Sequence, residues 1–480
     1  MSGLLQFDAG PAPASLSGGE LRVREPATGL PLAVVPLAAE ADVHVAVAAA
    51  RLTQPGWAAA PPVGRATVLR RAAAALERHR EEVANWLVRE GGAIRGKAEH
   101  EVGAALDELW EAAALPTRPH GSLLAAEPGQ ESVGRRVPLG VVGVISPWNV
   151  PLLLAMRAVA PALALGNAVV LKPDVHTPVS GGHVIARLFE EAGLPDGVLH
   201  VLPGDAGPGQ ALVEHPDVSM IDFTGSTAVG RRIGAAAGGA LKRVSLELGG
   251  NNALIVLDDA DLEAAASAGA SSSFFHQGQI CMAAGRHLIH RSVAGRYLDL
   301  LAEKARKLRV GDPFREEVDL GPVIDERQLD RIDRIVRDST SAGAEVVAGG
   351  SRRGPFYEPT VLSGVTPGMP AFTEEIFGPV APVTVFADDE EAVELANHTE
   401  YGLSAAVQTG STRRGRAIAE RLRTGTVHIN DQTINDAAHV PFGGRGASGN
   451  GSRHGSAHSW DTYTQWQWLT VRETPARCPF

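Results

Sequence analysis

The sequence predicts an α/β protein built from two doubly wound domains, in which helices cover both faces of a largely parallel sheet. From Val137 onward, apolar runs rich in β-branched residues alternate with helical stretches, and a second such series begins at Ala253. Strands that are apolar throughout and alternate with helices are typical of a parallel sheet buried on both faces. A chain of 480 residues also exceeds the size that one core usually supports, so two or three domains are expected.

The N-terminal part predicts a hairpin and three helices. Residues 1–20, rich in Ala, Gly, Pro and Ser, are expected to be irregular, and residues 21–35 to form the hairpin. The helices are expected at 41–52, 66–90 and 98–114. Apolar residues in the second helix recur at the helical period, and Gly91-Gly92 ends it.

Each alternating series predicts its own set of strands and helices. The first predicts strands at 140–146, 168–171, 198–202, 219–223 and 244–248, and helices at 152–165, 180–192, 209–214 and from Ser226. The second predicts strands at 254–257, 286–290, 345–348, 383–386, 405–408 and 426–429, and helices before Phe275 and at 293–308, 326–341 and 390–398. Nucleotides bind at the carboxyl ends of such parallel strands, so functional residues are expected there.

Composition excludes several classes of protein. A net charge of -11 without a basic block disfavours nucleic acid or an anionic membrane as partner. Two cysteines build no disulfide framework, and no Cys/His cluster suggests a metal, which fits a reducing cytoplasm. Residues 1–19 do not resemble a signal peptide, and prolines interrupt the longest apolar region, 141–171, which rules against a membrane span.

Cys281 is a candidate nucleophile. It lies in the stretch from Phe274 to Met282, after a glycine turn, and the other cysteine, Cys478, is close to the C-terminus. A thiolate is the most nucleophilic side chain available near neutral pH. The alternative is that Cys281 is a small buried hydrophobic residue.

Two polar residues at predicted strand ends have the chemistry that such a nucleophile needs. Asn149 could donate its amide to a developing oxyanion, or it could cap a turn. Glu247 lies at the end of an apolar strand, where burial would raise its pKa and suit it to act as a general base; alternatively, it is exposed at a sheet edge.

Two further strand ends could bind phosphate or ribose. Lys172-Pro173 closes one strand, and Phe223 to Thr227 closes another and opens a helix, whose N-terminal amides suit a phosphate. The sequence after Gly225 is not a P-loop. A formal Gly-x-Gly-x-x-Gly at Gly444 has no βαβ unit after it, so it predicts only a glycine-rich loop near Phe442.

Seven motifs, taken together and in order, resemble the NAD(P)-dependent aldehyde dehydrogenase superfamily over about residues 20–475. They are Pro-Trp-Asn at 147–149, Lys-Pro at 172–173, Phe-Thr-Gly-Ser at 223–226, Glu-Leu-Gly-Gly at 247–250, Gly-Gln-x-Cys at 278–281, Glu-Glu-Ile-Phe-Gly-Pro at 374–379 and Pro-Phe-Gly-Gly at 441–444. The segments 154–161, 276–282, 443–451 and 464–468 further resemble the benzaldehyde and vanillin dehydrogenase branch.

The resemblance implies a catalytic role for three residues. The Cys281 thiolate would attack the aldehyde carbon, and the Asn149 side chain and the Cys281 backbone N–H would hold the oxyanion. After hydride transfer, Glu247 would activate the water that releases the carboxylic acid.

The resemblance also implies a site for NAD or NADP. Lys172 would bind the adenosine ribose, Ser226 the pyrophosphate and Glu375 the nicotinamide ribose, beside Phe377. The remaining residues assigned to the cofactor groove are Ile145, Ser146, Pro147, Trp148, Val175 and Gly225. Many NAD-preferring members carry a glutamate where this chain has Val175, so loss of its repulsion toward a 2′-phosphate predicts that both cofactors are accepted.

An apolar pocket for a planar ring is expected around the thiol. Its predicted lining is Val150, Leu154, Arg157, Ile280, Met282 and Phe442. Arg157 would meet a ring substituent or a carboxylate, or else form a surface salt bridge. A succinate-type or other aliphatic semialdehyde, for which Arg157 would be the anion clamp, is the alternative substrate. The sequence also leaves open a coenzyme A-acylating enzyme or a non-catalytic structural protein.

The resemblance implies a domain plan and a homo-oligomer. Residues 1–118 and 138–247 would form the cofactor-binding domain, 248–443 the catalytic domain and 444–457 a return segment. Residues 119–137 and 458–478 would form a small β arm, whose edge strands predict a homodimer or homotetramer.

Overall fold

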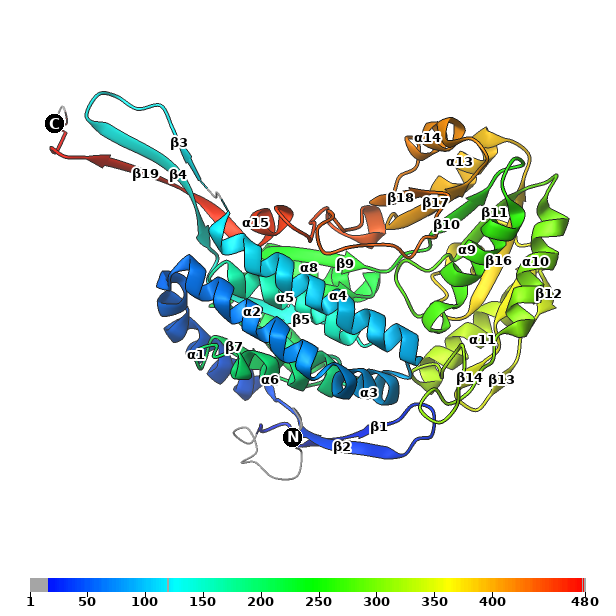
Figure 1. Ribbon diagram of the computed structural model, residues 1–480, viewed down its shortest axis with the longest axis horizontal. Helices are drawn as coiled ribbons and strands as arrows, with labels where there is room; N and C mark the ends of the chain where they lie inside the picture. Colours follow the sequence, from blue (N-terminus) through cyan, green and yellow to red (C-terminus); the bar gives the residue numbers. More distant parts are fainter. Residues whose placement is uncertain (1–15, 119–120, 477, 479–480) are drawn as a thin grey trace.

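The computed structural model describes residues 16–118, 121–476 and 478, and it contains two large sheets with helices packed around each (Figure 1). The first sheet is parallel throughout, in the order β7 (Leu199–Val201), β6 (Ala168–Lys172), β5 (Val141–Ile145), β8 (Met220–Gly225), β9 (Arg243–Leu248). The predicted first series of strands is therefore confirmed. Residues 1–15, part of the expected irregular start, lie outside the described residues.

The second sheet repeats this plan with one antiparallel edge. Its order is β12 (Glu345–Ala348), β15 (Thr360–Ser363), β16 (Val380–Phe386), β11 (Arg286–His290), β10 (Ala253–Val256), β17 (Ser404–Gln408), β18 (Thr426–Ile429), and β12 is antiparallel to β15. The α/β class with two doubly wound sheets is confirmed. The sequence analysis missed β15, because this short strand follows directly on the β13–β14 hairpin (Arg352–Arg353 and Phe356–Tyr357).

Helices flank both sheets. Those around the first sheet are α1 (Glu40–Ala59), α2 (Pro62–Arg78), α3 (Arg80–Gly91), α4 (Arg95–Ala114), α5 (Pro151–Ala164), α6 (Val184–Glu191), α7 (Ala206–Glu214) and α8 (Thr227–Gly239). Those around the second are α9 (Leu262–Phe274), α10 (Ala294–Lys307), α11 (Glu326–Ser341), α12 (Pro370–Thr373), α13 (Asp389–Asn397) and α14 (Thr412–Ala419). The short α12 and α14 were not predicted. Both end within eight residues, too few for a helical period to be recognised.

The single helix predicted at 66–90 is wrong, because the chain breaks there at His79 into α2 and α3. The backbone of His79 leaves helical geometry, with φ -102° and ψ 12°, and its ring lies 3.3 Å from Glu191. Leu76 and Val83 on either side of the break are both buried in one apolar cluster. The helical spacing of apolar residues therefore continues across the break, so the sequence pattern does not reveal it.

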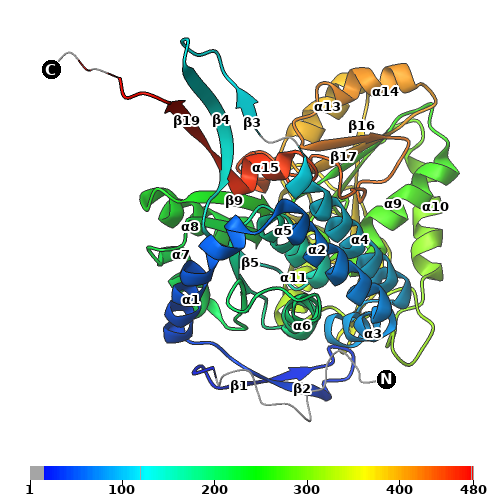
Figure 2. The same ribbon diagram turned by 60° about the vertical axis from the view of Figure 1, so that its left-hand side comes forward.

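A hairpin and an arm lie outside the two layered sheets. The predicted hairpin is confirmed as β1 (Glu20–Arg24) and β2 (Pro31–Pro36). The arm is an antiparallel sheet of β3 (Gly121–Leu123), β4 (Gln130–Pro138) and β19 (Thr464–Arg472), and it projects away from the rest of the molecule (Figure 2). The short helix α15 (His458–Tyr463) leads into β19.

The segments 132–137 and 459–471 were expected to be exposed strands in need of a partner. This is wrong for β4, which has β19 on one side and β3 on the other, whereas β19 keeps one free edge. β4 and β19 pair with each other within the chain, from Thr464 opposite Pro138 to Arg472 opposite Gln130. Their pairing joins segments far apart in the sequence, which no local pattern predicts. Trp466 and Trp468 remain 58% and 71% exposed on β19.

Membrane insertion finds no support in the helices. Within residues 16–118, 121–476 and 478, none of the helices combines the length and the apolar character that a bilayer crossing requires. The cytoplasmic location stays a prediction.

Candidate active site

The loop that carries Cys281 is held in an unusual backbone shape. After α9, His276 and Gln277 take left-handed conformations, with φ 51° and φ 57°, and Gly278 follows with φ 68°. A side chain at Gly278 would place its Cβ 2.1 Å from the carbonyl oxygen of Gly378, so only glycine fits. The Gln277 side chain donates to the carbonyl oxygens of Gly92 and Pro322 at 3.1 and 2.7 Å. Such strain is maintained only where the surroundings determine the conformation, and it is common at functional sites.

Cys281 itself is partly exposed, and hydrogen bonds hold its main chain in place. Asn252 donates to the carbonyl oxygen of Cys281 at 2.8 Å and to that of Ala283 at 2.8 Å. Burial raises the pKa of the thiol to about 12, and the carboxylates of Glu375, Asp436 and Glu247 add to the effect. The alternative of a small buried hydrophobic residue does not match the partial exposure of Cys281, and its role as a nucleophile stays a prediction.

Asn149 reaches the cysteine loop. Its side-chain amide donates to the carbonyl oxygen of Gln279 at 2.8 Å, across 130 residues of sequence. The alternative of a local turn cap is therefore wrong. An amide NH₂ group has two donors, so one N–H remains for an oxyanion at Cys281.

A buried ion pair on α4 supports the turn that contains Asn149. Lys97 and Glu101, one turn apart on α4, lie 2.5 Å from each other, and Lys97 also donates to the carbonyl oxygen of Asn149 at 2.8 Å. Glu101 accepts the backbone N–H groups of Leu152 and Leu153 at 2.9 and 3.3 Å, at the N-terminus of α5. The pair thus fixes both sides of the turn that presents the Asn149 amide.

Glu247 is buried without a partner. Its side chain lies near the end of β9 and is 4% exposed, and within the described residues neither carboxylate oxygen has a hydrogen bond of normal geometry. Burial, assisted by the carboxylate of Asp222, raises the pKa of Glu247 well above its ordinary value. Arg453, Arg157 and the nearby amide of Gly444 offset this only in part. The alternative of an exposed Glu247 is wrong, and the group has the character of a base that works near neutral pH.

The glycine-rich loop packs directly on Glu247. Gly449 forms an isolated bridge with Glu247, and a Cβ at Gly443 would lie 2.7 Å from the Glu247 carboxylate. A second bridge joins Phe442 to His454. The expectation that this loop shapes the surroundings of Phe442, without being a dinucleotide fingerprint, agrees with these contacts.

The predicted cofactor residues lie at the carboxyl ends of neighbouring strands. Ile145 and Lys172 are paired in register at the ends of β5 and β6, and β8 ends at Gly225 beside them. Ser226 is exposed to solvent at the N-terminus of α8, and its side chain makes no capping hydrogen bond. Trp148, in the turn after β5, packs edge-on against Phe377, with ring centroids 5.5 Å apart.

Unsatisfied polar groups at these strand ends fit a dinucleotide. The Oγ of Ser146 is buried with no partner among the described residues. Among the described residues, the Lys172 ammonium forms no ion pair, and burial lowers its pKa. Glu375 accepts the N–H of Gly250 at 3.0 Å, and burial raises its pKa to about 7. The donors suit phosphate and ribose oxygens, and the acceptor suits a ribose hydroxyl.

A histidine clamps the loop that carries Val175. His176 lies between the carboxylates of Asp174 and Asp325, at 2.7 and 3.2 Å. Burial disfavours its charged form, but these contacts outweigh burial and raise the pKa of His176 to about 9. The Asp174 carboxylate beside Val175 is therefore already engaged by a cation.

The predicted apolar wall forms around the thiol. Ile280, Met282 and Phe442 are buried in one cluster with Leu403, and Cys281 and Ile434 pack against it. Val150 and Leu154 are half-buried at the start of α5. Together these residues form an apolar environment next to the reactive atom.

Arg157 differs from both roles predicted for it. It is buried, its Nε donates to Glu108 at 2.8 Å, its Nη2 donates to Asp436 at 2.6 Å, and its guanidinium stacks on Phe442 at 4.8 Å. The surface salt bridge is therefore wrong. A guanidinium already held by two carboxylates is also a poor clamp for a third.

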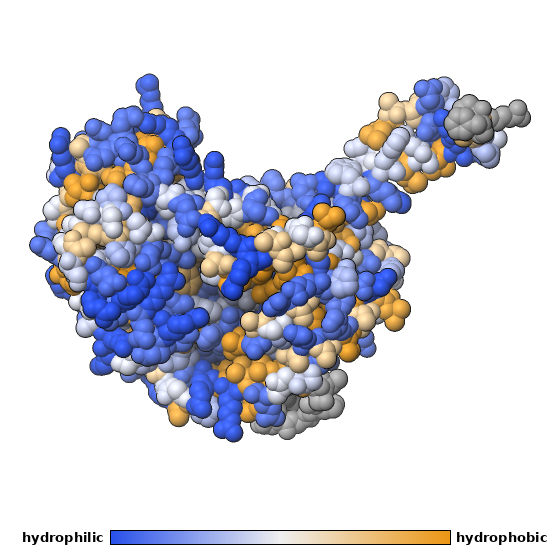
Figure 3. All heavy atoms as spheres, turned by 180° about the vertical axis from the view of Figure 1, so that it is seen from behind, coloured by the Kyte–Doolittle hydropathy of each residue, from blue (hydrophilic) through white to orange (hydrophobic). Residues whose placement is uncertain are grey.

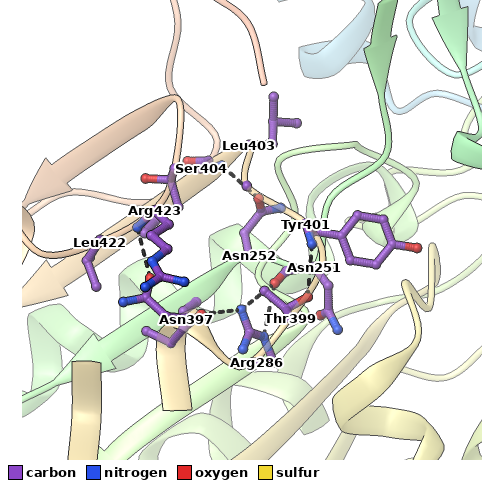
Figure 4. A pocket seen from close by; sticks show the side chains of 15 residues that line it. Asn251, Asn252, Arg286, Asn397, Thr399, Tyr401, Leu403, Ser404, Leu422 and Arg423 are labelled. Atoms are coloured by element: carbon purple, nitrogen blue, oxygen red, sulfur yellow. Dashed lines mark hydrogen bonds between the residues drawn. The ribbon is translucent and has the colours of Figure 1, made fainter. Parts of the chain in front are cut away.

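Sequence reasoning missed several residues that support the site. Those with charged or amide side chains are Lys97, Glu101, Glu108, Asn252, Gln279, Arg286 and Asp436. A signal existed on α4, where Lys97, Glu101 and Glu108 lie on the same face as buried apolar residues. Figure 4 shows Asn252 and Arg286 beside a small cavity. Its free volume of about 10 Å³ has room for a water molecule but not a substrate.

Comparison with known proteins gives consistent matches over nearly the whole chain. Residues 14–469 match the model described as the aldehyde dehydrogenase family. A vanillin dehydrogenase from Amycolatopsis sp. is 54% identical, with 97% of this chain and 96% of that protein covered. An NAD(+) benzaldehyde dehydrogenase from Pseudomonas putida is 53% identical, with 96% and 95% covered.

Solved structures agree with these matches. An NADP-dependent enzyme from E. coli superposes with a TM-score of 0.92 at 34% identity, covering 95% of both chains. A betaine aldehyde dehydrogenase from Staphylococcus aureus, solved in complex with NAD+, has a TM-score of 0.92 at 30% identity, covering 96% of this chain and 92% of the other.

Proposed function

The chain belongs to the aldehyde dehydrogenase family, and from that premise we propose that it oxidises an aromatic aldehyde to the carboxylic acid. The observation that carries the proposal is the unpaired, buried carboxylate of Glu247, electrostatically coupled to the partly exposed thiol of Cys281. Relatives named vanillin and benzaldehyde dehydrogenase support the substrate class.

In the proposed reaction, the Cys281 sulfur loses its proton and attacks the aldehyde carbon. The free N–H of the Asn149 amide and the Cys281 backbone N–H hold the resulting oxyanion, and each such donor contributes about 3 kcal/mol. A bound NAD(P) would supply the hydride acceptor for this oxidation, and Cys281 would then hold the acyl group as a thioester. Glu247 then takes a proton from water, and the hydroxide releases the acid.

The cofactor would be held by residues at the strand ends. Lys172 would bind the adenosine ribose, Ser226 the pyrophosphate at the α8 N-terminus, and Glu375 the nicotinamide ribose. Trp148 and Phe377 would border the nicotinamide end. The unpartnered Oγ of Ser146 supports this arrangement, as does the Lys172 ammonium, whose hydrogen bond to the carbonyl oxygen of Pro173 is long, at 3.4 Å.

We further propose that both NAD and NADP are accepted. Val175 brings no carboxylate to the ribose, and the Asp174 carboxylate is engaged by His176, so repulsion of a 2′-phosphate is weak. Steady-state kinetics should show kcat/KM values within about a hundredfold for the two cofactors. A Val175→Glu variant should lose NADP activity selectively, and a larger preference for NAD in the unmodified enzyme would contradict the proposal.

The substrate is tested with a panel of aldehydes. We expect kcat/KM to be highest for benzaldehyde and its ring-substituted relatives, because the wall around Cys281 is apolar. Succinic semialdehyde should be poor, since Arg157 is already paired with Glu108 and Asp436. Acid formed without coenzyme A would exclude an acylating enzyme, and a Cys281→Ser variant with near-normal turnover would refute the catalytic assignment.

The domain plan and the oligomer are also proposals. We assign residues 1–118 and 138–247 to the cofactor, 248–443 to catalysis and 444–457 to the return segment. The arm, with its exposed tryptophans and the free edge of β19, supports a dimer or tetramer. Apolar side chains also gather on the surface below the arm (Figure 3). Light scattering at micromolar concentration should give at least a dimer, and a monomer would contradict it.

A further inference from the structure

We propose that Asp436 is a specificity-determining residue, whose carboxylate makes the aldehyde pocket select uncharged aromatic aldehydes over aldehydes that carry a carboxylate. The inference rests on the proposed function, because it concerns the substrate of the same site. Its support is the contacts of Asp436, the position of Asp436 relative to Cys281 and the balance of charge around it.

Asp436 is the most exposed member of a buried charge cluster. The side chains of Arg157 and Glu108 are each 7% exposed, whereas that of Asp436 is 17% exposed. Arg157 lies between the two carboxylates and stacks on Phe442 at 4.8 Å. The carboxylate of Asp436 is therefore the most accessible charged group of the cluster.

The same carboxylate lies close to the reacting thiol. Ile434, two residues earlier in the loop after β18, packs on the apolar cluster that contains Phe442 and adjoins Cys281. Asp436 acts on the pKa of the Cys281 thiol more strongly than Glu247 does, and Glu108 is not among the main groups that act on it. Of the two carboxylates that hold Arg157, Asp436 is the more exposed, and its loop reaches the apolar cluster beside Cys281 through Ile434.

The balance of charge in this region is negative. When both are ionised, Glu108 and Asp436 carry two negative charges against the one positive charge of Arg157, which leaves the cluster at -1 (1 − 2). Burial raises the pKa of Glu108, so the more exposed Asp436 is the main source of this charge. Glu247 and Glu375 also act on the thiol with negative charge when ionised. In a partly desolvated pocket like charges several ångströms apart repel strongly, so a carboxylate on the substrate ring is disfavoured, while an uncharged ring loses nothing.

Turnover of a matched pair of aldehydes tests the selection. We compare 4-formylbenzoate with its methyl ester, which keeps the ring but removes the charge, in the unmodified enzyme and in Asp436→Asn. The enzyme should prefer the ester, and Asp436→Asn should raise the acid-to-ester ratio of kcat/KM about tenfold. Glu108→Gln removes the same charge farther from the thiol and should change the ratio less. Equal use of both aldehydes by the unmodified enzyme would overturn the proposal.

Alkylation of Cys281 tests it without turnover. Iodoacetate and iodoacetamide differ in charge but not in leaving group, and their rate ratio with glutathione provides the reference. In a Cys478→Ser background, Cys281 should favour iodoacetamide beyond that reference, and Asp436→Asn should reduce this preference about tenfold. An unchanged ratio in the folded variant would overturn the proposal. An altered ratio in a protein that does not oxidise benzaldehyde would support the charge selection and refute the proposed function instead.

Discussion

Two buried carboxylates near the candidate site have opposite surroundings. Glu101, at the junction of α4 and α5, is paired with Lys97 and accepts the N–H groups of Leu152 and Leu153. Glu247, near the end of β9, has no normal hydrogen bond from its carboxylate and no ion pair among the described residues. Both are almost completely removed from solvent.

The difference separates a structural charge from a reactive one. A buried charge is costly unless it is paired and hydrogen-bonded, so Glu101 holds the Asn149 turn in a single shape. For Glu247, no ion pair or normal hydrogen bond among the described residues offsets the cost of burying a charge. Its pKa is therefore raised, and its oxygens remain available to take a proton. Perturbed groups of this second kind, placed beside a nucleophile, mark a catalytic base.

The largest effect is expected from removing the reactive carboxylate. Glu247→Gln should reduce steady-state acid formation about a thousandfold, or about 4 kcal/mol of barrier, because an amide cannot take a proton from water. The first turnover should still yield a burst of NAD(P)H in stopped-flow absorbance. Equal losses in the burst and the steady state would show that Glu247 does not act at the hydrolytic step.

Breaking the structural pair should mainly affect stability. Lys97→Met leaves Glu101 charged and unpaired, so the free energy of unfolding should fall by about 3 kcal/mol, measured by denaturant unfolding. Lys97→Met combined with Glu101→Gln should recover much of the loss, since a neutral side chain still accepts the α5 amides. If the double variant is less stable than the single one, the pair is not the cause.

Asn149 connects the two regions, and its removal should slow the first half-reaction. Asn149→Ala should lower the rate of the NAD(P)H burst about a hundredfold, or about 2.7 kcal/mol, because an oxyanion donor is lost. Stability should change much less than in Lys97→Met. A burst of normal rate would mean that the amide only anchors the carbonyl oxygen of Gln279.

Glu90 is an intermediate case that sharpens the comparison. It is buried without a cation in hydrogen-bond contact, but it accepts the N–H groups of Val179 and Ser180 and the Ser180 hydroxyl. Burial raises its pKa to about 7, from 4.5, despite these donors. At a pH between these two values, the folded protein keeps a proton on Glu90 that the unfolded chain has released.

The effect of Glu90 on stability follows from this proton. As pH rises from about 5 to about 7, the ionised form accumulates first in the unfolded state, so Glu90 should reduce the free energy of unfolding by about 2 kcal/mol. Thermal unfolding of Glu90→Gln should therefore lose less stability over this interval than the unmodified protein. Parallel curves for the two proteins would show that the pKa of Glu90 is not raised.

The sequence alone determined the fold class, and it predicts the three residues at the centre of the candidate site. Apolar strands that alternate with helices indicated parallel sheets, and the carboxyl ends of parallel strands share one edge, which brought Asn149 and Glu247 to the same side. Cys281 followed from its motif. The fold class is confirmed because it depends on local pattern and on the geometry common to all such sheets, while the catalytic roles of the three residues stay a prediction.

The tertiary structure decided which charges are paired. Arg157 meets Asp436 across 279 residues, and Asn149 meets Gln279 across 130. The break between α2 and α3 and the pairing of β4 with β19 were equally invisible in the local pattern. A side chain's pKa depends on what lies against it, and for Glu247 that surrounding exists only once the glycine-rich loop has closed over the end of β9.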